Sequence, residues 1–127
     1  MEDYLRIRSQ VGWIELGKEQ AAKALTNSLY IVGAYDNDNL VGMGRIVGDG
    51  AVICYIQDLI VVPDSQHLGV GSMVLETLVK HVKSFCIGES KMMLCLMCAK
   101  GREKFYEKHG FIARPTDNLG PGMIQYL

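Results

Sequence analysis

Two glycines could give this chain a phosphate-binding turn. Gly69 and Gly71 follow an apolar stretch that ends at Val62, and an amphipathic run begins just after them. Glycines at a strand-to-helix turn let the backbone bend tightly and let an anion approach the main chain, because they carry no Cβ. The N–H groups and the dipole of the helix's first turn then favour negative charge. A plain tight connection, with Ser72 as a residue that starts the helix, explains the same local pattern equally well.

Two common phosphate-binding motifs are excluded, because residues that each of them requires are absent. A P-loop requires Lys followed by Ser or Thr directly after its second glycine, whereas Ser72 and Met73 follow Gly71 here. A dinucleotide fingerprint requires a third glycine at the position where Val74 stands. A phosphate-binding role for this turn therefore needs a different motif.

A pair of cysteines, Cys95 and Cys98, has the spacing of some metal and redox sites. A zinc site needs two further ligands, and Cys54 and Cys86 do not form a second pair. Residues three apart on a strand also face opposite sides of a sheet. We therefore predict buried, unreactive thiols and no metal site. Reduced cysteines and a charged N-terminus without an apolar signal core predict a cytoplasmic protein.

Length and composition predict one globular domain over residues 1–127, since 49% of the residues are hydrophobic and 21% are charged. The net charge is -1 and the charges are interspersed. These values give no electrostatic reason to expect a nucleic-acid or membrane partner. No apolar run reaches the roughly 20 residues of a membrane span.

Hydrophobic periodicity predicts helices first, then an antiparallel meander, then alternating strands and helices. We expect helices over residues 2–8 and 18–27, a helix after the glycine turn that Gly88 ends, and a helix over 102–109. We expect strands over residues 29–35, 40–47, 51–62, 92–97, 111–114 and 123–127. This order predicts an α/β (α+β) fold with a mixed, mainly antiparallel sheet flanked by helices.

Two separated motifs resemble those of the Gcn5-related N-acetyltransferase (GNAT) family. The pattern Gln66-x-x-Gly69-x-Gly71, after the strand over 57–63, resembles the family's acetyl-CoA motif. Residues 105–111, Phe-Tyr-Glu-Lys-His-Gly-Phe, resemble the helix and turn that follow it in the family. One helix and one strand lie between the motifs, as in the family. The resemblance covers residues 18–127 and implies acetyl-CoA as co-substrate and a splayed central pair of strands.

The resemblance also implies a cofactor site. Main-chain N–H groups of the turn would hold the pyrophosphate of coenzyme A, and Gln66 would add hydrogen bonds without charge. The backbone of the preceding strand would pair with the pantetheine arm, and N–H groups in the same region would steady the oxyanion. The implied residues are Leu68, Gly69, Val70, Gly71 and Ser72 in the turn, and Leu59, Ile60 and Val61 in the strand.

Tyr106 stands where the resembling enzymes have a tyrosine that protonates the leaving thiolate and lies near the cofactor's sulfur. A phenol, with an unperturbed pKa near 10, is protonated at neutral pH and can act as a general acid. The alternative is that Tyr106 only packs its ring and hydrogen-bonds the cofactor.

The general base stays open. Gln57 stands where some family members have a glutamate, and an amide cannot accept the proton. Asp58 is the side chain that we take as the catalytic candidate, although a purely structural role fits it equally well. Asp49, Glu15 and a water chain are the other candidates. Ala99 stands where many members have an asparagine, which removes one expected contact to the cofactor.

The first third of the chain builds the acceptor pocket in the resembling enzymes, so Trp13 and Tyr30 are candidate substrate contacts, with plain packing as the alternative. Family members usually open with a strand, whereas this chain opens with a helical pattern, so the initial family strand is absent or replaced. An uncovered sheet edge would favour a homodimer.

The resemblance implies an N-acetyltransferase that moves the acetyl group of acetyl-CoA to a primary amine of a small molecule or peptide, by direct attack in a ternary complex. The alternative is a non-catalytic acyl-CoA-binding domain, because Gln57 and Ala99 depart from the family pattern.

Overall fold

Three consecutive antiparallel strands form the centre of the structure, which is a computed structural model that describes residues 1–127. The chain groups into two units, Met1–Cys95 and Leu96–Leu127. None of its helices is long and apolar enough to cross a membrane. The elements in chain order are α1 (Glu2–Gln10), α2 (Lys18–Thr26), β1 (Tyr30–Asp36), β2 (Asn39–Gly48), β3 (Ile53–Val61), the 3-10 helix η1 (Pro63–Ser65), α3 (Val70–Lys83), β4 (Met93–Leu96) and α4 (Glu103–Lys108).

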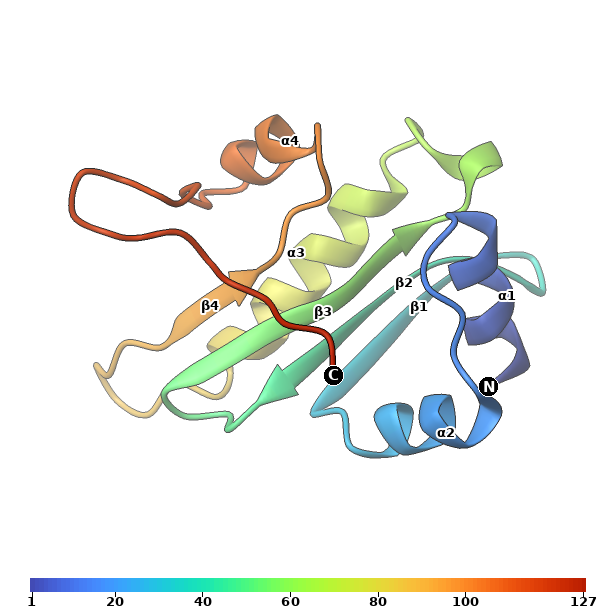
Figure 1. Ribbon diagram of the computed structural model, residues 1–127, viewed down its shortest axis with the longest axis horizontal. Coiled ribbons are helices and arrows are strands. Elements are labelled where there is room, and N and C mark those ends of the chain that lie inside the picture. Colours follow the sequence, from blue (N-terminus) through green and yellow to red (C-terminus); the bar gives the residue numbers. More distant parts are fainter. The chain divides into compact units, whose positions relative to one another are not determined.

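The sheet has the strand order β1-β2-β3-β4. The arrows of β3 and β4 point the same way, and α3 connects the two strands (Figure 1). The mixed, mostly antiparallel sheet flanked by helices confirms the predicted fold class. The first element is a helix, in agreement with the helical pattern at the start of the sequence.

Helix α3 covers one face of the sheet (Figure 1). A Cβ at Gly44 of β2 would lie 2.5 Å from Leu78 Cδ1 and 2.8 Å from Val74 Cγ1. Glycine in the middle of this strand therefore lets α3 pack directly on the backbone. The buried face of α3 carries four apolar residues at helical spacing: Val74, Leu75, Leu78 and Val82.

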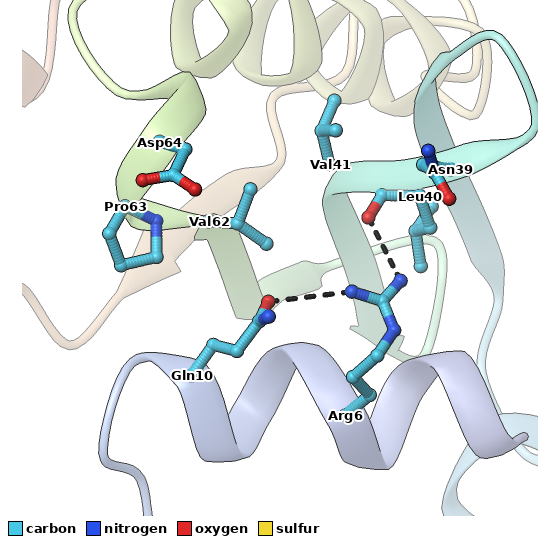
Figure 2. A pocket seen from close by; sticks show the side chains of 8 residues that line it. All are labelled: Arg6, Gln10, Asn39, Leu40, Val41, Val62, Pro63 and Asp64. Atoms are coloured by element: carbon cyan, nitrogen blue, oxygen red, sulfur yellow. Dashed lines mark hydrogen bonds between the residues drawn. The ribbon is translucent and has the colours of Figure 1, made fainter.

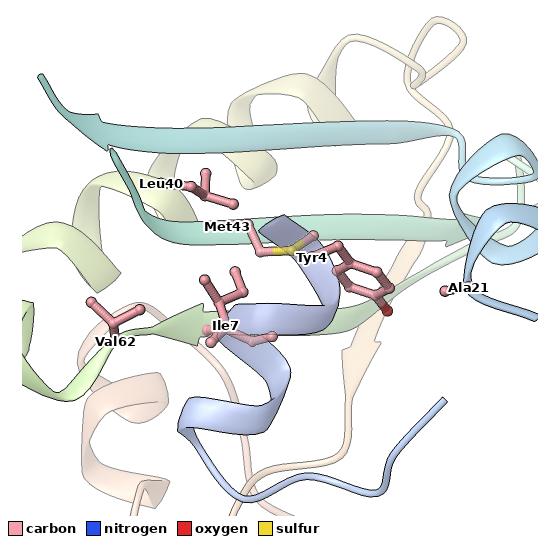
Figure 3. Packing of buried hydrophobic residues seen from close by; sticks show 7 residues of the cluster. Tyr4, Ile7, Ala21, Leu40, Met43 and Val62 are labelled. Atoms are coloured by element: carbon pink, nitrogen blue, oxygen red, sulfur yellow. The ribbon is translucent and has the colours of Figure 1, made fainter. Parts of the chain in front are cut away.

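Helix α1 packs on the opposite face of the sheet, over β2 and β3 (Figure 3). Its two buried residues, Tyr4 and Ile7, join a cluster with Met43 of β2 and Ile60 of β3. Ala21 of α2 belongs to the same cluster. The two faces of the sheet therefore have separate cores, one under α1 and α2 and one under α3.

Strand β3 contains an irregularity in its pairing with β2. Arg45 lies opposite Asp58, but the next residue of β2, Ile46, lies opposite Ile56. Gln57 is therefore the extra residue of a β-bulge, which leaves it outside the regular ladder. Gln57 is exposed, while Asp58 is completely buried.

The second unit, residues 96–127, contains one helix. Helix α4 ends in a Schellman arrangement, in which the Phe111 N–H donates to Tyr106 O and the Gly110 N–H donates to Glu107 O. Gly110 has φ 90°, as expected for the residue that caps this helix.

The predicted strands over residues 111–114 and 123–127 were wrong, because neither segment is a strand. The Thr116 N–H donates to Leu119 O, and Arg114 Nε donates to Gly120 O, so local turn contacts replace a strand ladder. Pro115 also has no N–H to contribute to a ladder. The other predicted elements are present, with ends that differ by a few residues.

Candidate active site

The turn between β3 and α3 has the backbone geometry of an anion-binding helix start. Gly69 is the residue just before α3 and has φ 84°, in the left-handed region that glycine adopts without strain. Its carbonyl accepts the Met73 N–H at 3.1 Å, which is the first hydrogen bond of the helix. The N–H groups of Val70 and Gly71 precede that bond, so the helix itself offers them no acceptor.

The space beside Gly69 is open, since a Cβ built there would meet no atom within 4 Å. A flexible residue, an open approach and the positive end of α3 are together suited to an anionic group. The residues present therefore fit the diphosphate of coenzyme A. Leu68, next to Gly69, is 74% exposed, so this part of the turn lies at the surface.

Gln66 supports the turn from within. Its Nε2 donates to Val61 O at 3.0 Å, so the side chain ties the turn to the end of β3. A direct contact from Gln66 to a phosphate stays a prediction, as do the contacts of the N–H groups of residues 68–72.

One edge of the C-terminal half of β3 pairs with β2. Leu59, Ile60 and Val61 pair with β2 on that edge. On the other edge, the Met93 N–H of β4 donates to Val52 O at 3.0 Å, seven residues before Leu59. Strand β4 has only four residues. It runs in the same direction as β3, so its four residues end before they reach Leu59, and β4 itself does not pair with Leu59, Ile60 and Val61.

Asp58 lies at the centre of a buried ionic network. Its Oδ2 accepts the Tyr4 hydroxyl at 2.6 Å and Arg45 Nε at 2.8 Å, and its Oδ1 accepts a nitrogen of the Arg8 guanidinium at 3.2 Å. The Asp58 side chain is 0% exposed, and those of Arg8 and Arg45 are 12% and 8% exposed. Burial and the hydrogen bond to Asp58 raise the pKa of Tyr4, so its hydroxyl stays a donor.

These contacts favour the structural alternative for Asp58. A carboxylate that is paired with two guanidinium groups and a phenol has its acceptor positions occupied, and a proton on it would disrupt both ion pairs. Burial also separates it from an incoming amine. Sequence reasoning considered Asp58 without its partners, because Tyr4 and Arg8 lie 54 and 50 residues away in the chain.

Asp49, another candidate base, is a turn residue. One of its carboxylate oxygens accepts three backbone N–H groups, from Ala51, Val52 and Ile53, at 2.8, 2.8 and 3.0 Å. These hydrogen bonds lower the pKa of Asp49, which makes it a weaker base. Glu15 is exposed in the connection between α1 and α2.

Trp13 and Tyr30, the two predicted substrate contacts, lie on opposite faces of the sheet. Trp13 packs against the cluster under α1, and its ring lies 5.2 Å from the Arg8 guanidinium carbon. Tyr30 pairs with Ile46 in β2 and stacks on His81 of α3, with ring centroids 3.6 Å apart. The structure therefore does not bring them together, and the stacking favours a packing role for Tyr30.

Tyr106 lies in α4 of the second unit. Its ring makes edge contacts with Phe105 and Phe111, with centroids 5.1 and 5.8 Å away. Burial, with a smaller contribution from Cys98, raises the pKa of Tyr106 to about 12. The phenol is therefore protonated at neutral pH, as a proton donor must be.

The cysteines differ in environment. Cys54 is buried and Cys95 is half-buried, but Cys86 and Cys98 are exposed. The prediction of a buried thiol was therefore wrong for Cys98. Desolvation raises the pKa of the half-buried Cys95, and partial desolvation of the thiol together with the charge of Glu103 raises the pKa of Cys98, which lowers the thiolate fraction of both at neutral pH. No group of three or more His, Cys, Asp or Glu side chains is arranged to hold a metal ion.

A pocket of about 250 Å³ lies between α1, the start of β2 and the end of β3 (Figure 2). The Arg6 guanidinium, which lines the pocket, donates to Leu40 O at 3.0 Å and to Gln10 Oε1 at 3.4 Å. Sequence reasoning missed this pocket; the only signal for it was the pair of polar residues four apart on α1. The lining residues are Arg6, Gln10, Asn39, Leu40, Val41, Val62, Pro63 and Asp64.

Comparison with known proteins gives consistent matches. The sequence model of the Acetyltransferase (GNAT) family matches residues 2–111. The uncharacterized N-acetyltransferase ycf52 of Pyropia yezoensis is 30% identical over 87% of this chain. The match covers 63% of that relative, so the chain spans just under two thirds of the length of the curated relatives that it matches first.

Solved structures match over most of the chain. A "probable acetyltransferase" of meticillin-resistant Staphylococcus aureus has a TM-score of 0.86 and 35% identity, covering 98% of this chain and 92% of that one. Naa50 of Arabidopsis thaliana, in complex with the bisubstrate analogue CoA-Ac-MVNAL, has a TM-score of 0.72 and 22% identity, covering 90% and 78%. The second likeness shows the shared fold.

Proposed function

Since this chain belongs to the acetyltransferase (GNAT) family, with acetyl-CoA as its acetyl donor, we propose that it transfers the acetyl group to a primary amine by direct attack in a ternary complex. The observation that carries the proposal is the turn before α3. There, Gly69 combines a left-handed backbone, open space and the first N–H groups of the helix. Such a turn holds a diphosphate through the main chain, without a cationic side chain.

The extended edge of β3 continues from this turn. With the diphosphate at the turn, the pantetheine arm runs back along Val61 and Leu59 and pairs with their backbone. At about 3.4 Å per residue, the four residue steps from Val61 to Gln57 span roughly 14 Å. The thioester end of the arm therefore lies toward the bulge at Gln57.

In the proposed reaction, the amine nitrogen attacks the thioester carbonyl carbon, a C–N bond forms and the C–S bond breaks. The substrate ammonium first gives one proton to water, so that the neutral amine attacks, and the nitrogen gives a second proton to water after the C–N bond has formed. Water takes these protons because Asp58 and Asp49 are engaged in structural hydrogen bonds. Tyr106 donates a hydrogen bond to the departing sulfur, and the free thiolate takes its proton from solvent. Backbone N–H groups of β3 stabilise the oxyanion. No covalent enzyme intermediate is needed, because the amine attacks the thioester itself.

The acceptor is a small-molecule or peptide amine. The net charge of -1 supplies no long-range attraction for strongly cationic acceptors. The Arabidopsis relative holds an analogue that joins CoA to a short peptide, which supports including peptide amines among the candidates.

The test is a turnover assay with acetyl-CoA and a panel of aryl, alkyl, polyamine and peptide amines, following release of free thiol. We expect turnover with at least one amine and a reduced kcat in Tyr106→Phe. Tight acetyl-CoA binding without turnover on any amine would support the non-catalytic acyl-CoA-binding alternative. Absence of coenzyme A binding by calorimetry would contradict both functions.

A further inference from the structure

We propose that Asp58 is a positioning residue that fixes the β3 bulge and the connection between α1 and α2 in one arrangement. It thereby sets the geometry in which the thioester is attacked. The inference rests on the proposed function, because that function places the thioester end at the bulge. It gives Asp58 a role in the reaction without any proton transfer to its carboxylate.

The bulge depends on the Asp58 contacts. Asp58 follows the extra residue Gln57 and lies opposite Arg45, where the register of β2 and β3 shifts. The Arg45 Nε donates to Asp58 Oδ2 at 2.8 Å across that position. The ion pair therefore holds the two strands together at the one point where the ladder is interrupted, which determines how the Gln57 peptide is presented.

Arg45 extends the network to α2. Another nitrogen of its guanidinium lies 3.3 Å from Ala24 O and 3.2 Å from Ser28 Oγ, so it donates to both at the end of α2. The Ser28 hydroxyl donates in turn to Ala24 O at 2.8 Å. One side chain of β2 thus joins the Asp58 carboxylate to α2.

Arg8 extends the network to the connection between α1 and α2. It donates to Asp58 Oδ1 at 3.2 Å and, through its other terminal nitrogen, to Ile14 O at 3.0 Å. Its guanidinium carbon lies 5.2 Å from the Trp13 ring centroid. The Arg8 Nε is buried and has no hydrogen-bond partner. Arg8 therefore depends on Asp58 for its charge compensation, and Trp13 depends on Arg8 for its position.

The network is sensitive to the loss of the negative charge on Asp58. Two guanidinium groups share one carboxylate, so neutralising Asp58 leaves two poorly hydrated cations without a countercharge. Removing one partner of a buried ion pair is strongly destabilising, because it leaves an uncompensated buried charge. The cations can recover hydration only by moving, and their movement would release both the bulge and the Trp13 segment.

The experiment compares Asp58→Asn, Tyr4→Phe and Val82→Ala. Tyr4→Phe removes one hydrogen bond to Asp58 and keeps both ion pairs, so it stays folded if Asp58→Asn does not. Val82 lies on the buried side of α3, on the other face of the sheet. Its truncation lowers stability, and Val82 is not part of the network. Trp13 is the only tryptophan, so its emission and acrylamide quenching report on the segment independently of activity.

We expect more quenching of Trp13 in the two network variants and unchanged quenching in Val82→Ala. We also expect kcat to fall by about 10- to 100-fold in Asp58→Asn, as for a misplaced reacting group, and by less in Tyr4→Phe. Coenzyme A affinity and the inflections of the pH profile should be unchanged.

Loss of the acidic limb of the pH profile in Asp58→Asn would overturn the inference and make Asp58 a base. Wild-type quenching in both network variants, or an equal fall of kcat in Val82→Ala, would also overturn it. Failure of the wild-type protein to acetylate any amine would contradict the proposed function alone, because the fluorescence of Trp13 would still test the network.

Discussion

Substituting Gly69 by alanine separates the strain of the turn from its proposed contact with coenzyme A. Gly69 has φ 84°, and a Cβ there would meet no protein atom within 4 Å. The substitution therefore adds no clash within the protein. It adds the cost of holding alanine in the left-handed region, roughly 1–2 kcal/mol, and places a methyl group where the diphosphate approaches.

Gly88→Ala is the matched control. Gly88 has φ 58° and also has no atom within 4 Å of its Cβ position, but it lies between α3 and β4, outside the turn. Both variants should lose about the same stability without ligand, near 4 °C in Tm for each kcal/mol in a domain of this size. Only Gly69→Ala should bind coenzyme A more weakly.

Thermal shift measures the difference. At a coenzyme A concentration of 100 times Kd, binding stabilises a protein by about 2.7 kcal/mol. A tenfold weaker Kd at the same concentration reduces this to about 1.4 kcal/mol. Gly69→Ala should therefore show about half the ligand-induced shift of Gly88→Ala. Equal ligand-induced shifts in Tm in the two variants, with equal losses of Tm without ligand, would contradict diphosphate binding at this turn.

Three further predictions test the packing and the titrating groups. Gly44→Ala should lose about 1–3 kcal/mol in urea unfolding from overpacking against Leu78, and Leu78→Val in the same chain should recover part of it; additive losses would contradict the contact. Asp49→Asn should lower Tm at neutral pH. Because the folded pKa lies below the ordinary 3.8, the stability from Asp49 is present above that pH and is lost as the pH falls through the folded value, so melting curves of the two proteins should converge in acid. The pKa of Tyr106 is about 12 in the folded protein, above the ordinary 10.0, so the stability that the neutral phenol contributes is lost as the pH rises through that interval. Tyr106→Phe should therefore lose less stability over this pH range in alkaline unfolding followed by circular dichroism. A Tyr106→Phe curve parallel to the wild-type curve would show that the phenol is exposed.

The sequence was sufficient for elements whose pattern is local. The meander and α3 follow from periodicity and turn residues, and the glycine turn follows from Gly69 and its neighbours. Pairing at a distance was not predictable. The bulge at Gln57 shifts the register by one residue, and nothing in the local alternation marks it. Without the register of β2 and β3, nothing in the sequence indicated that Asp58 pairs with Arg8 or Arg45. The expected strand over residues 123–127 failed for the opposite reason: its local propensity is high, but the segment makes no ladder.

The raised pKa of Tyr106 bears on how a thiolate would leave in the proposed reaction. A thiol has an ordinary pKa near 8.5, well below the value of about 12 for this phenol. Complete proton transfer from the phenol to the thiolate is therefore uphill, whereas a hydrogen bond to the developing negative charge is favourable from the start. Burial, the cause of the raised pKa, also strengthens that hydrogen bond, because fewer water molecules compete for it. Tyr106 thus fits best as a donor that stabilises the departing sulfur, with the proton on the free thiol coming from solvent. The two roles of this residue, general acid and hydrogen-bond donor, therefore differ in the source of the thiol's proton, which is the phenol in the first case and solvent in the second.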